Sequence, residues 1–254
     1  MAWLGVLIFI FFLIINVVAF LLRKNQKVCY AIVYTIAIYL LIFKVIEYVC
    51  YQIQGLHIKI PVEFSALSYF ILAITVLTRK EKLEQFGAFV ALLAGLMFSI
   101  SFWVSPDSFV SSIDTMFLFV CSIINHHLLY FASILLIFNV RRYNYKYCWI
   151  QLIGVGVMVG YSWLIHLFTN YSDIYKKPII IQICDGTILD WLGAKNIPAW
   201  GYALYIALAV VALFGILAGF YALNNVFANK RKKQGLIENY MPKKFVEIYK
   251  RESK

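Results

Sequence analysis

Long apolar stretches alternate with short polar gaps along the whole chain. Each stretch holds about 20 or more residues, the length that crosses a hydrocarbon core as a helix. The pattern therefore predicts an all-α polytopic membrane protein, a bundle of seven transmembrane helices. Pro61 either kinks the third helix or marks its true start. The predicted spans are 2–22, 28–53, 55–78, 86–104, 112–140, 147–169 and 200–224.

Positive charge falls in every second gap between these spans. Eighteen Lys and Arg residues lie in the gaps on one side, and four lie on the other. Because Lys and Arg are enriched in cytoplasmic loops, this bias predicts an external N-terminus and a cytoplasmic C-terminus. The eighteen lie within 23–27, 79–82, 141–146 and 230–254, and the four are Lys59, Lys176, Lys177 and Lys195.

The composition agrees with a membrane protein. Charged residues make up 14% of the chain, against roughly 25% in a soluble domain. The net charge of +11 does not indicate a nucleic-acid partner, because the basic residues gather at span ends, where anionic headgroups attract them. No Gly-rich phosphate loop or zinc-binding spacing occurs, so no cofactor or metal is expected. The Ile-, Lys- and Phe-rich usage and the lack of a targeting peptide indicate a multi-pass protein of a bacterial inner membrane.

We divide the chain into a transmembrane domain, 1–224, and a basic tail, 225–254. The tail is either an interfacial amphipathic helix on anionic headgroups or a solvated segment. The outer loop 170–199 carries an apolar run, which either dips into the interface as a lid or forms an ordered surface loop. Of the five cysteines only Cys184 lies in an outer loop, so no disulfide framework is expected.

Ionisable side chains inside the predicted spans are the first candidates for function. Each costs at least about 2.5 kcal/mol in a bilayer core, so such groups face the bundle interior and find partners. Lys44 and Glu47 stand three residues apart on one helix and are predicted to pair. Residues near the outer ends of spans can instead reach water. The full set is Lys44, Glu47, Glu63, Asp114, His126, His127 and His166.

Ser65 and His126 are predicted to share one depth. They lie 13 and 14 residues from the inner ends of their spans, which places both roughly 20 Å deep. A serine hydroxyl needs a base to become a nucleophile, and histidine is the usual base. His127 points about 100° away from His126, so only one of them faces a given partner. Asn125 or Glu63 can orient the imidazole, as the third group of a hydrolase triad does.

Other interpretations of these residues remain open at this point. A serine in a membrane helix often bonds a backbone carbonyl, and a histidine pair can bridge helices. Haem or metal ligation by His126 or His127 would need a second ligand, for which His166 is the only candidate.

Several short motifs occur together in an order that resembles a known family. They are Ile60-Pro61-Val62-Glu63-Phe64-Ser65 with the run ending at Arg79-Lys80, then Asn125-His126-His127-Leu128, Asn170-Tyr171, Lys177-Pro178, and Asp190-Trp191-Leu192-Gly193 with Pro198 and Tyr202. Over about 28–224 the chain resembles the YwaF-like bacterial integral membrane proteins. That family is related to the eukaryotic transmembrane phospholipid acyltransferases and, distantly, to the androgen-induced-protein lipid hydrolases. The resemblance implies a seven-helix bundle with a nucleophile on the third span and a histidine on the fifth.

Carried over to this chain, the resemblance assigns the nucleophile to Ser65, where the family usually has Cys, and the base to His126. It also marks Asn170 and Tyr171 as an outer-loop signature. The family's His-x-Cys reads Glu63-x-Ser65 here, and a serine asks more of its base than a cysteine. The chain is therefore either a serine variant or an inactive relative.

The leading hypothesis is a lipid acyltransferase or lipid-ester hydrolase acting on a membrane phospholipid or other acyl lipid. Lys44, Glu47 and the loop 170–199 motivate the alternative, a non-enzymatic lipid-binding scaffold or small-solute transporter.

Overall fold

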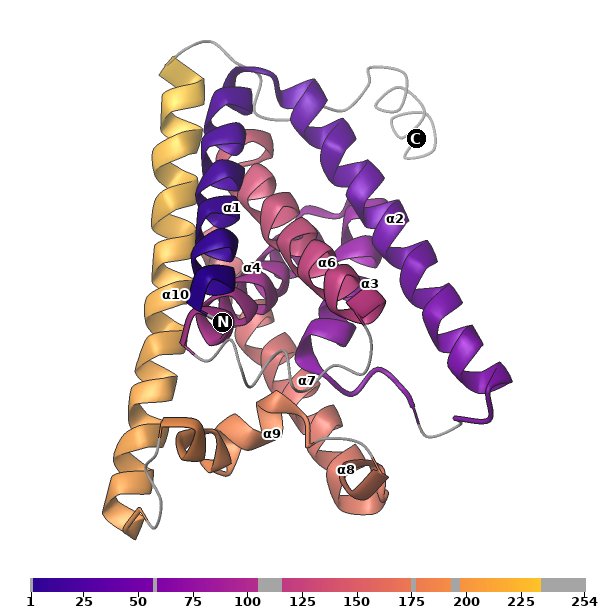
Figure 1. Cartoon of the computed structure of the whole chain (residues 1–254). Coiled ribbons are helices and arrows are strands. Elements are labelled where there is room, and N and C mark those ends of the chain that lie inside the picture. The colour runs from indigo at the N-terminus through magenta and orange to yellow at the C-terminus, as the bar shows by residue number, and fades with distance from the viewer. Residues whose placement is uncertain (1, 57–58, 105–115, 175–176, 193–196, 234–254) are drawn as a thin grey trace, which may run out of the picture.

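The computed structural model describes residues 2–56, 59–104, 116–174, 177–192 and 197–233, and it contains no β-strand in those ranges. Figure 1 shows a bundle of long helices with shorter helices at one end. The prediction of an all-α chain is confirmed for the described residues. The principal helices are α1 (Ala2–Leu21), α2 (Gln26–Ile53), α3 (Phe64–Thr78), α4 (Glu81–Val104), α6 (Met116–Leu135), α7 (Cys148–Phe168) and α10 (Ala199–Lys233).

Six of these helices are long and apolar enough to cross a membrane, and α3, with 15 residues, is shorter. The predicted start of the third span, residue 55, is wrong, because α3 begins at Phe64. Pro61 lacks an N–H and restricts the residue before it, and Glu63 is still extended, with ψ of 141°. The number of spans and their orientation stay predictions.

The sixth long helix also ends later than predicted. α10 continues without a break to Lys233, so the predicted span end at 224 falls inside a helix. Residues 234–254 of the predicted tail, 225–254, and the predicted intramembrane residue Asp114 lie outside the described residues.

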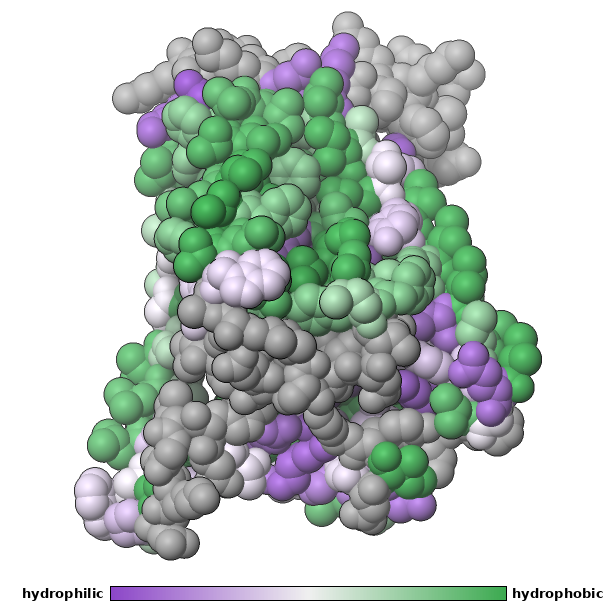
Figure 2. Space-filling model, viewed as in Figure 1, coloured by the Kyte–Doolittle hydropathy of each residue, from purple (hydrophilic) through white to green (hydrophobic). Residues whose placement is uncertain are grey.

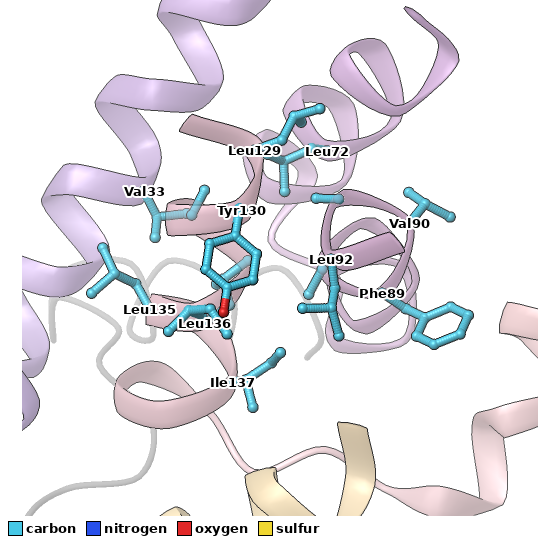
Figure 3. Close-up of a cluster of buried hydrophobic side chains, with 14 of the residues drawn as sticks. Val33, Leu72, Phe89, Val90, Leu92, Leu129, Tyr130, Leu135, Leu136 and Ile137 are labelled. Atoms are coloured by element: carbon cyan, nitrogen blue, oxygen red, sulfur yellow. The ribbon is translucent and has the colours of Figure 1, made fainter. Parts of the chain in front are cut away.

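α4 is the central helix of the bundle. Of its most apolar window 67% is buried, against 11% for α10, and its main neighbours are α3 and α6. The core around it is drawn in Figure 3, where aliphatic side chains and Tyr130 from several helices interdigitate. Fully buried members include Val33, Leu72, Phe89, Val90, Leu129, Leu135, Leu136 and Ile137.

The outer faces of the bundle are apolar. Leu7 on α1, Ile46 on α2, Val157 on α7 and Val211 on α10 are each more than half exposed. Figure 2 shows such residues as a broad green belt over one side of the molecule. A soluble protein rarely exposes so much contiguous apolar surface, whereas a bilayer requires it. The fold is therefore that of a multi-pass membrane protein.

Turns at one end of the bundle carry the basic residues, and we call this the basic end. The 3-10 turn η1 (Leu22–Lys24) joins α1 to α2, where the Asn25 side chain accepts a hydrogen bond from the Val28 amide at 3.2 Å and caps α2. α3 ends at Arg79, whose φ of 57° stops the helix. A second 3-10 turn, η3 (Tyr145–Tyr147), precedes α7.

The last turn of α6 widens into a π-helical segment, η2 (Leu136–Val140). The Asn224 side chain of α10 accepts from the Tyr143 amide at 2.7 Å and donates to the carbonyls of Ile137 and Arg141 at 2.8 and 2.7 Å. These bonds satisfy backbone groups that the end of a helix leaves unpaired. They also fasten α10 to the centre of the bundle.

The opposite end, which we call the loop end, holds the segment between α7 and α10. Its described part forms α8 (Tyr171–Ile174), α9 (Ile179–Cys184) and the 3-10 helix η4 (Thr187–Leu192). α9 packs against α7 and buries Ile181 completely. Lys177 and Asp185 form an ion pair beside it. The described part of the predicted outer loop is thus ordered into short helices.

Candidate functional site

A cavity of about 260 Å³ lies between α2, α3 and α6 and reaches the segments that lead into α3 and α8. Figure 1 shows α2 extending past α6 at its C-terminal end, and it is the C-terminal half of α2 that lines this cavity. Most of the sequence-predicted site residues meet there. The cavity wall includes Lys44, Glu47, Glu63, Ser65, Asn125, His126 and Tyr171.

Ser65, in the first turn of α3, lines this cavity. None of the described residues forms a hydrogen bond with its hydroxyl. Ser68, three residues later, instead donates to the Phe64 carbonyl at 2.7 Å. The difference follows from position, because the carbonyl four residues before Ser65 belongs to Pro61, ahead of the helix. The alternative interpretation, in which the Ser65 hydroxyl donates to a helix carbonyl, is therefore wrong for the described structure.

His126 lines the same cavity from α6. Its Nδ1 lies 2.7 Å from the Ser122 carbonyl, 3.4 Å from the Ser122 hydroxyl and 3.2 Å from the Tyr69 hydroxyl. A carbonyl only accepts, so we assign the proton to Nδ1 and leave a lone pair on Nε2. The ring stacks on Phe98 with centroids 4.0 Å apart. The imidazole is therefore held in one orientation with a nitrogen available as a base.

Ser65 and His126 line one cavity, but no hydrogen bond joins them. The partner of His126 on α3 is Tyr69, which stands one helical turn beyond Ser65. Sequence reasoning missed Tyr69, although its spacing of four from Ser65 places both on one face of the helix.

The two residues beside His126 differ in where they face. Asn125 is 1% exposed, lines the cavity, and its Oδ1 is buried without a hydrogen-bond partner among the described residues. His127 does not line the cavity; its Nδ1 lies 2.8 Å from the Ile123 carbonyl and its ring packs beside Phe11. Only one histidine of the pair thus faces this cavity, as the angle between neighbouring residues on a helix predicts.

Lys44 and Glu47 form the predicted ion pair, which is confirmed. Their charged atoms are 2.5 Å apart, and the Tyr51 hydroxyl donates to the other carboxylate oxygen at 3.0 Å. The Lys44 ammonium also lies 4.7 Å from the centre of the Tyr69 ring. The pair is part of the cavity wall, so it presents compensated charge to whatever enters.

Glu63 lies at the start of α3, outside the spanning helices. Its carboxylate accepts a hydrogen bond from the Ile179 amide at 3.2 Å, which ties α9 to the mouth of the cavity. Burial raises the pKa of Glu63 to about 7, and the Ile179 bond only partly opposes that shift. Within the described structure no imidazole bonds to Glu63, so it does not orient His126 directly.

The remaining candidates lie apart from this cavity. Asn170 is exposed and does not line it, unlike its neighbour Tyr171. His166 bonds the Ser172 hydroxyl through Nδ1 at 2.7 Å and is also absent from the wall. The part of the chain that the structure describes contains no group of three His, Cys, Asp or Glu side chains placed to hold a metal ion.

A family model described as the TMEM164 family matches residues 1–225, which include six of the principal helices, α10 as far as Asn225, and both Ser65 and His126. The chain belongs to the TMEM164 family. This is a family of transmembrane proteins, in agreement with the apolar belt and the six long helices. No curated protein and no solved structure matches the chain. The relationship of this TMEM164 family member to YwaF-like proteins and to acyltransferases stays a prediction.

Proposed function

We propose that this TMEM164 family member is a membrane-embedded lipid acyltransferase or lipid-ester hydrolase. Ser65 is the nucleophile and His126 is the general base. The observation that supports the proposal most is that Ser65, whose hydroxyl has no hydrogen-bond partner among the described residues, and His126, whose Nε2 has none there either, line one cavity. They come from helices far apart in the sequence, as in other nucleophile–base pairs.

The first step transfers an acyl group to the protein. The Ser65 oxygen attacks the ester carbonyl carbon of a lipid while Nε2 of His126 takes the hydroxyl proton. The Asn125 amide is the donor in the wall best suited to stabilise the resulting oxyanion, because the described residues accept no bond from its nitrogen. The tetrahedral intermediate then collapses, and the imidazolium returns the proton to the departing alcohol oxygen.

The second step releases the acyl group. Water, or the hydroxyl of a second lipid, attacks the acyl-Ser65 carbonyl while His126 again accepts the proton. Collapse breaks the acyl–serine bond, the imidazolium returns its proton to the Ser65 oxygen, and the product is a fatty acid or a newly acylated lipid. Water as acceptor makes the protein a hydrolase, and a lipid as acceptor makes it an acyltransferase.

The substrate we propose is a membrane phospholipid or another acyl lipid. Acyl chains enter beside α2, whose outward residues Ile42, Ile46 and Val49 are at least half exposed. We also propose that the basic end lies in the cytoplasm and that the membrane is a bacterial inner membrane, following the charge bias and composition.

The test is labelling of the purified full-length protein with a fluorophosphonate lipid, which forms a covalent bond with activated serines. We expect labelling of the wild type, none of Ser65→Ala, and strongly reduced labelling of His126→Gln. Ser68→Ala is the matched control, since that hydroxyl lies on the same helix and is bonded to Phe64. Labelling that persists in Ser65→Ala would exclude this nucleophile.

A lipid-binding scaffold is the second candidate, and the lack of a Ser65–His126 hydrogen bond favours it. It predicts that phospholipid co-purifies with the protein but is not consumed. Mass spectrometry of a defined phospholipid incubated with the protein separates the two functions. Appearance of free fatty acid or of transacylated lipid, absent in Ser65→Ala, supports the enzyme, and unchanged lipid supports the scaffold.

A further inference from the structure

A second cavity, of about 170 Å³, lies at the basic end between η1, η2 and α10. Among the described residues, its wall has three basic and three aromatic members: Phe20, Arg23, Phe138, Phe227, Lys230 and Arg231. It shares no lining residue with the cavity of Ser65 and His126. We call it the basic cavity.

The aromatic rings hold the cations in place without neutralising them. The Arg23 guanidinium lies 3.7 Å from the centre of the Phe20 ring and donates to the Phe20 carbonyl at 2.8 Å. The Lys230 ammonium lies 5.4 Å from the centre of the Phe227 ring, which stacks on Phe138. Ring faces attract cations and leave their positive charge intact.

Arg231 is anchored in the floor of the basic cavity. It is 3% exposed and donates to the carbonyl of Phe138 in the middle of η2. None of the ion pairs found among the described residues involves Arg23 or Lys230. Arg23 and Lys230 thus lie beside Arg231 around a small space, and the described part of its wall contains no acidic side chain. Arg23 and Lys230 repel each other across this space, and an anion bound between them would offset that repulsion.

We propose that the basic cavity binds a phosphate group. Arginine matches the oxygens of a phosphate with two parallel hydrogen bonds, and lysine adds a point charge. The space is much larger than the roughly 10–15 Å³ that a water molecule requires. A tetrahedral oxyanion therefore fits both its size and its charge.

The phosphate can come from an anionic lipid headgroup or from a soluble phosphate. The lipid source has structural support, because the basic cavity lies where α1 and α10 leave the apolar belt. Leu21 on α1 and Val226 on α10 are next in sequence to the lining residues Phe20 and Phe227, and they are 68% and 48% exposed. Acyl chains can lie along such side chains. Binding in the basic cavity differs from diffuse attraction of anionic headgroups to the basic tail, because it requires particular side chains. The inference does not depend on the proposed chemistry at Ser65.

The experiment uses the full-length protein in nanodiscs of phosphatidylcholine, with or without a fraction of phosphatidylglycerol. Native mass spectrometry counts bound phosphatidylglycerol, and thermal unfolding reports stabilisation. The test variant is the double substitution Arg23→Gln and Lys230→Gln. The matched control is Lys80→Gln with Lys146→Gln, which removes the same charge from exposed positions at the same end. A third arm adds inorganic phosphate to nanodiscs of phosphatidylcholine alone.

We expect the double variant to retain phosphatidylglycerol about tenfold less well or worse, because charge-assisted bonds are lost, and the control to resemble the wild type. Stabilisation by inorganic phosphate that the double variant loses would identify a soluble phosphate as the ligand and would also support the site. Equal losses in both variants would show diffuse attraction and overturn the proposal. Retention that is unchanged in the double variant, with no response to phosphate, would overturn it as well.

Discussion

The Tyr69 hydroxyl lies 3.2 Å from Nδ1 of His126 and joins α3 to α6 at the wall of the larger cavity. Ser65 stands one turn before Tyr69 on the same helix, so this contact ties the helix that carries the serine to the helix that carries the imidazole. The Lys44 ammonium lies over the Tyr69 ring, 4.7 Å from its centre. Tyr69 is thus a positioning residue between the proposed nucleophile, the base and the ion pair.

Tyr69→Phe removes only this hydroxyl, so we expect a modest effect. The Ser122 carbonyl and the Phe98 ring still hold His126, and one hydrogen bond contributes about 1 kcal/mol. Turnover of a lipid ester should fall several-fold, whereas His126→Gln should lower it by about 10² to 10⁴. Steady-state kinetics of both variants checks this. A loss in Tyr69→Phe as large as that in His126→Gln would show that Tyr69 acts in the chemistry itself.

Gly95 lets α4 and α6 approach each other beneath His126. A Cβ at this position would lie 2.6 Å from the Tyr130 Cβ and 3.0 Å from the His126 carbonyl. We therefore expect Gly95→Ala to lower the free energy of unfolding by about 1–3 kcal/mol, the usual cost of overpacking. Gly160→Ala is the control, because nothing lies within 4 Å of a Cβ there and alanine favours a helix.

Thermal unfolding of the two alanine variants in detergent measures this difference. We expect a lower midpoint for Gly95→Ala and an unchanged or higher one for Gly160→Ala. An unchanged midpoint for Gly95→Ala would mean that the α4–α6 contact is looser than described. A loss of lipid-ester turnover in Gly95→Ala, with the protein still folded, would link this contact to the position of His126.

Glu84 and Arg141 form a buried ion pair near the basic end. Their nearest charged atoms are 3.4 Å apart, and the Glu84 side chain is 0% exposed. Removing one partner of a buried pair leaves an uncompensated charge, so Arg141→Met should cost about 3–5 kcal/mol. Adding Glu84→Gln should restore part of that loss, because the stranded carboxylate is then gone.

Arg142→Met serves as the control for this pair. Arg142 is the next residue along the chain but is exposed, and surface substitutions usually change stability by no more than about 0.5 kcal/mol. Denaturant unfolding of the single and double variants gives the coupling between Glu84 and Arg141. Strictly additive effects of the two substitutions would show that the pair does not interact.

The sequence alone was sufficient to predict most of the helices and several local relationships. Apolar runs of about 20 residues located the long helices because the bilayer dictates that length. A spacing of three predicted the Lys44–Glu47 pair, and the angle between neighbouring residues predicted that His126 and His127 face different ways. Each of these inferences needs only the geometry of a single helix.

What the sequence could not supply is how helices are rotated against one another. The contact of Tyr69 with His126 depends on the relative faces of α3 and α6, which no spacing within one helix determines. The same holds at the basic end, where Arg141 and Arg231 are buried although they belong to clusters interpreted as headgroup anchors. The apolar run also concealed the true start of α3, because Ile60 and Val62 continue its hydrophobic pattern around Pro61.

The Glu63 carboxyl predicts how stability depends on pH. Burial raises its pKa from 4.5 to about 7, so the folded protein holds this proton more tightly than the unfolded chain. The contribution of Glu63 to stability is therefore largest below pH 4.5, falls as the pH rises from there to about 7, and is constant above. The substitution Glu63→Gln replaces the carboxyl with an amide, which does not titrate in this pH range. It should therefore remove this dependence of stability on pH.

Thermal unfolding of the wild type and of Glu63→Gln between about pH 5 and about pH 8 tests this. The readout is the difference between the two unfolding midpoints at each pH. Both proteins contain Glu47, Lys59 and His126, so the contributions of these residues to stability cancel in the difference. Asp185 adds little in this window: burial raises its pKa, but bonds from Lys177 and Thr187 outweigh that effect and lower it below its ordinary value. We expect the wild type to lose stability relative to Glu63→Gln as the pH rises. A constant difference would mean that the Glu63 carboxyl at the mouth of the cavity is more hydrated than its burial indicates.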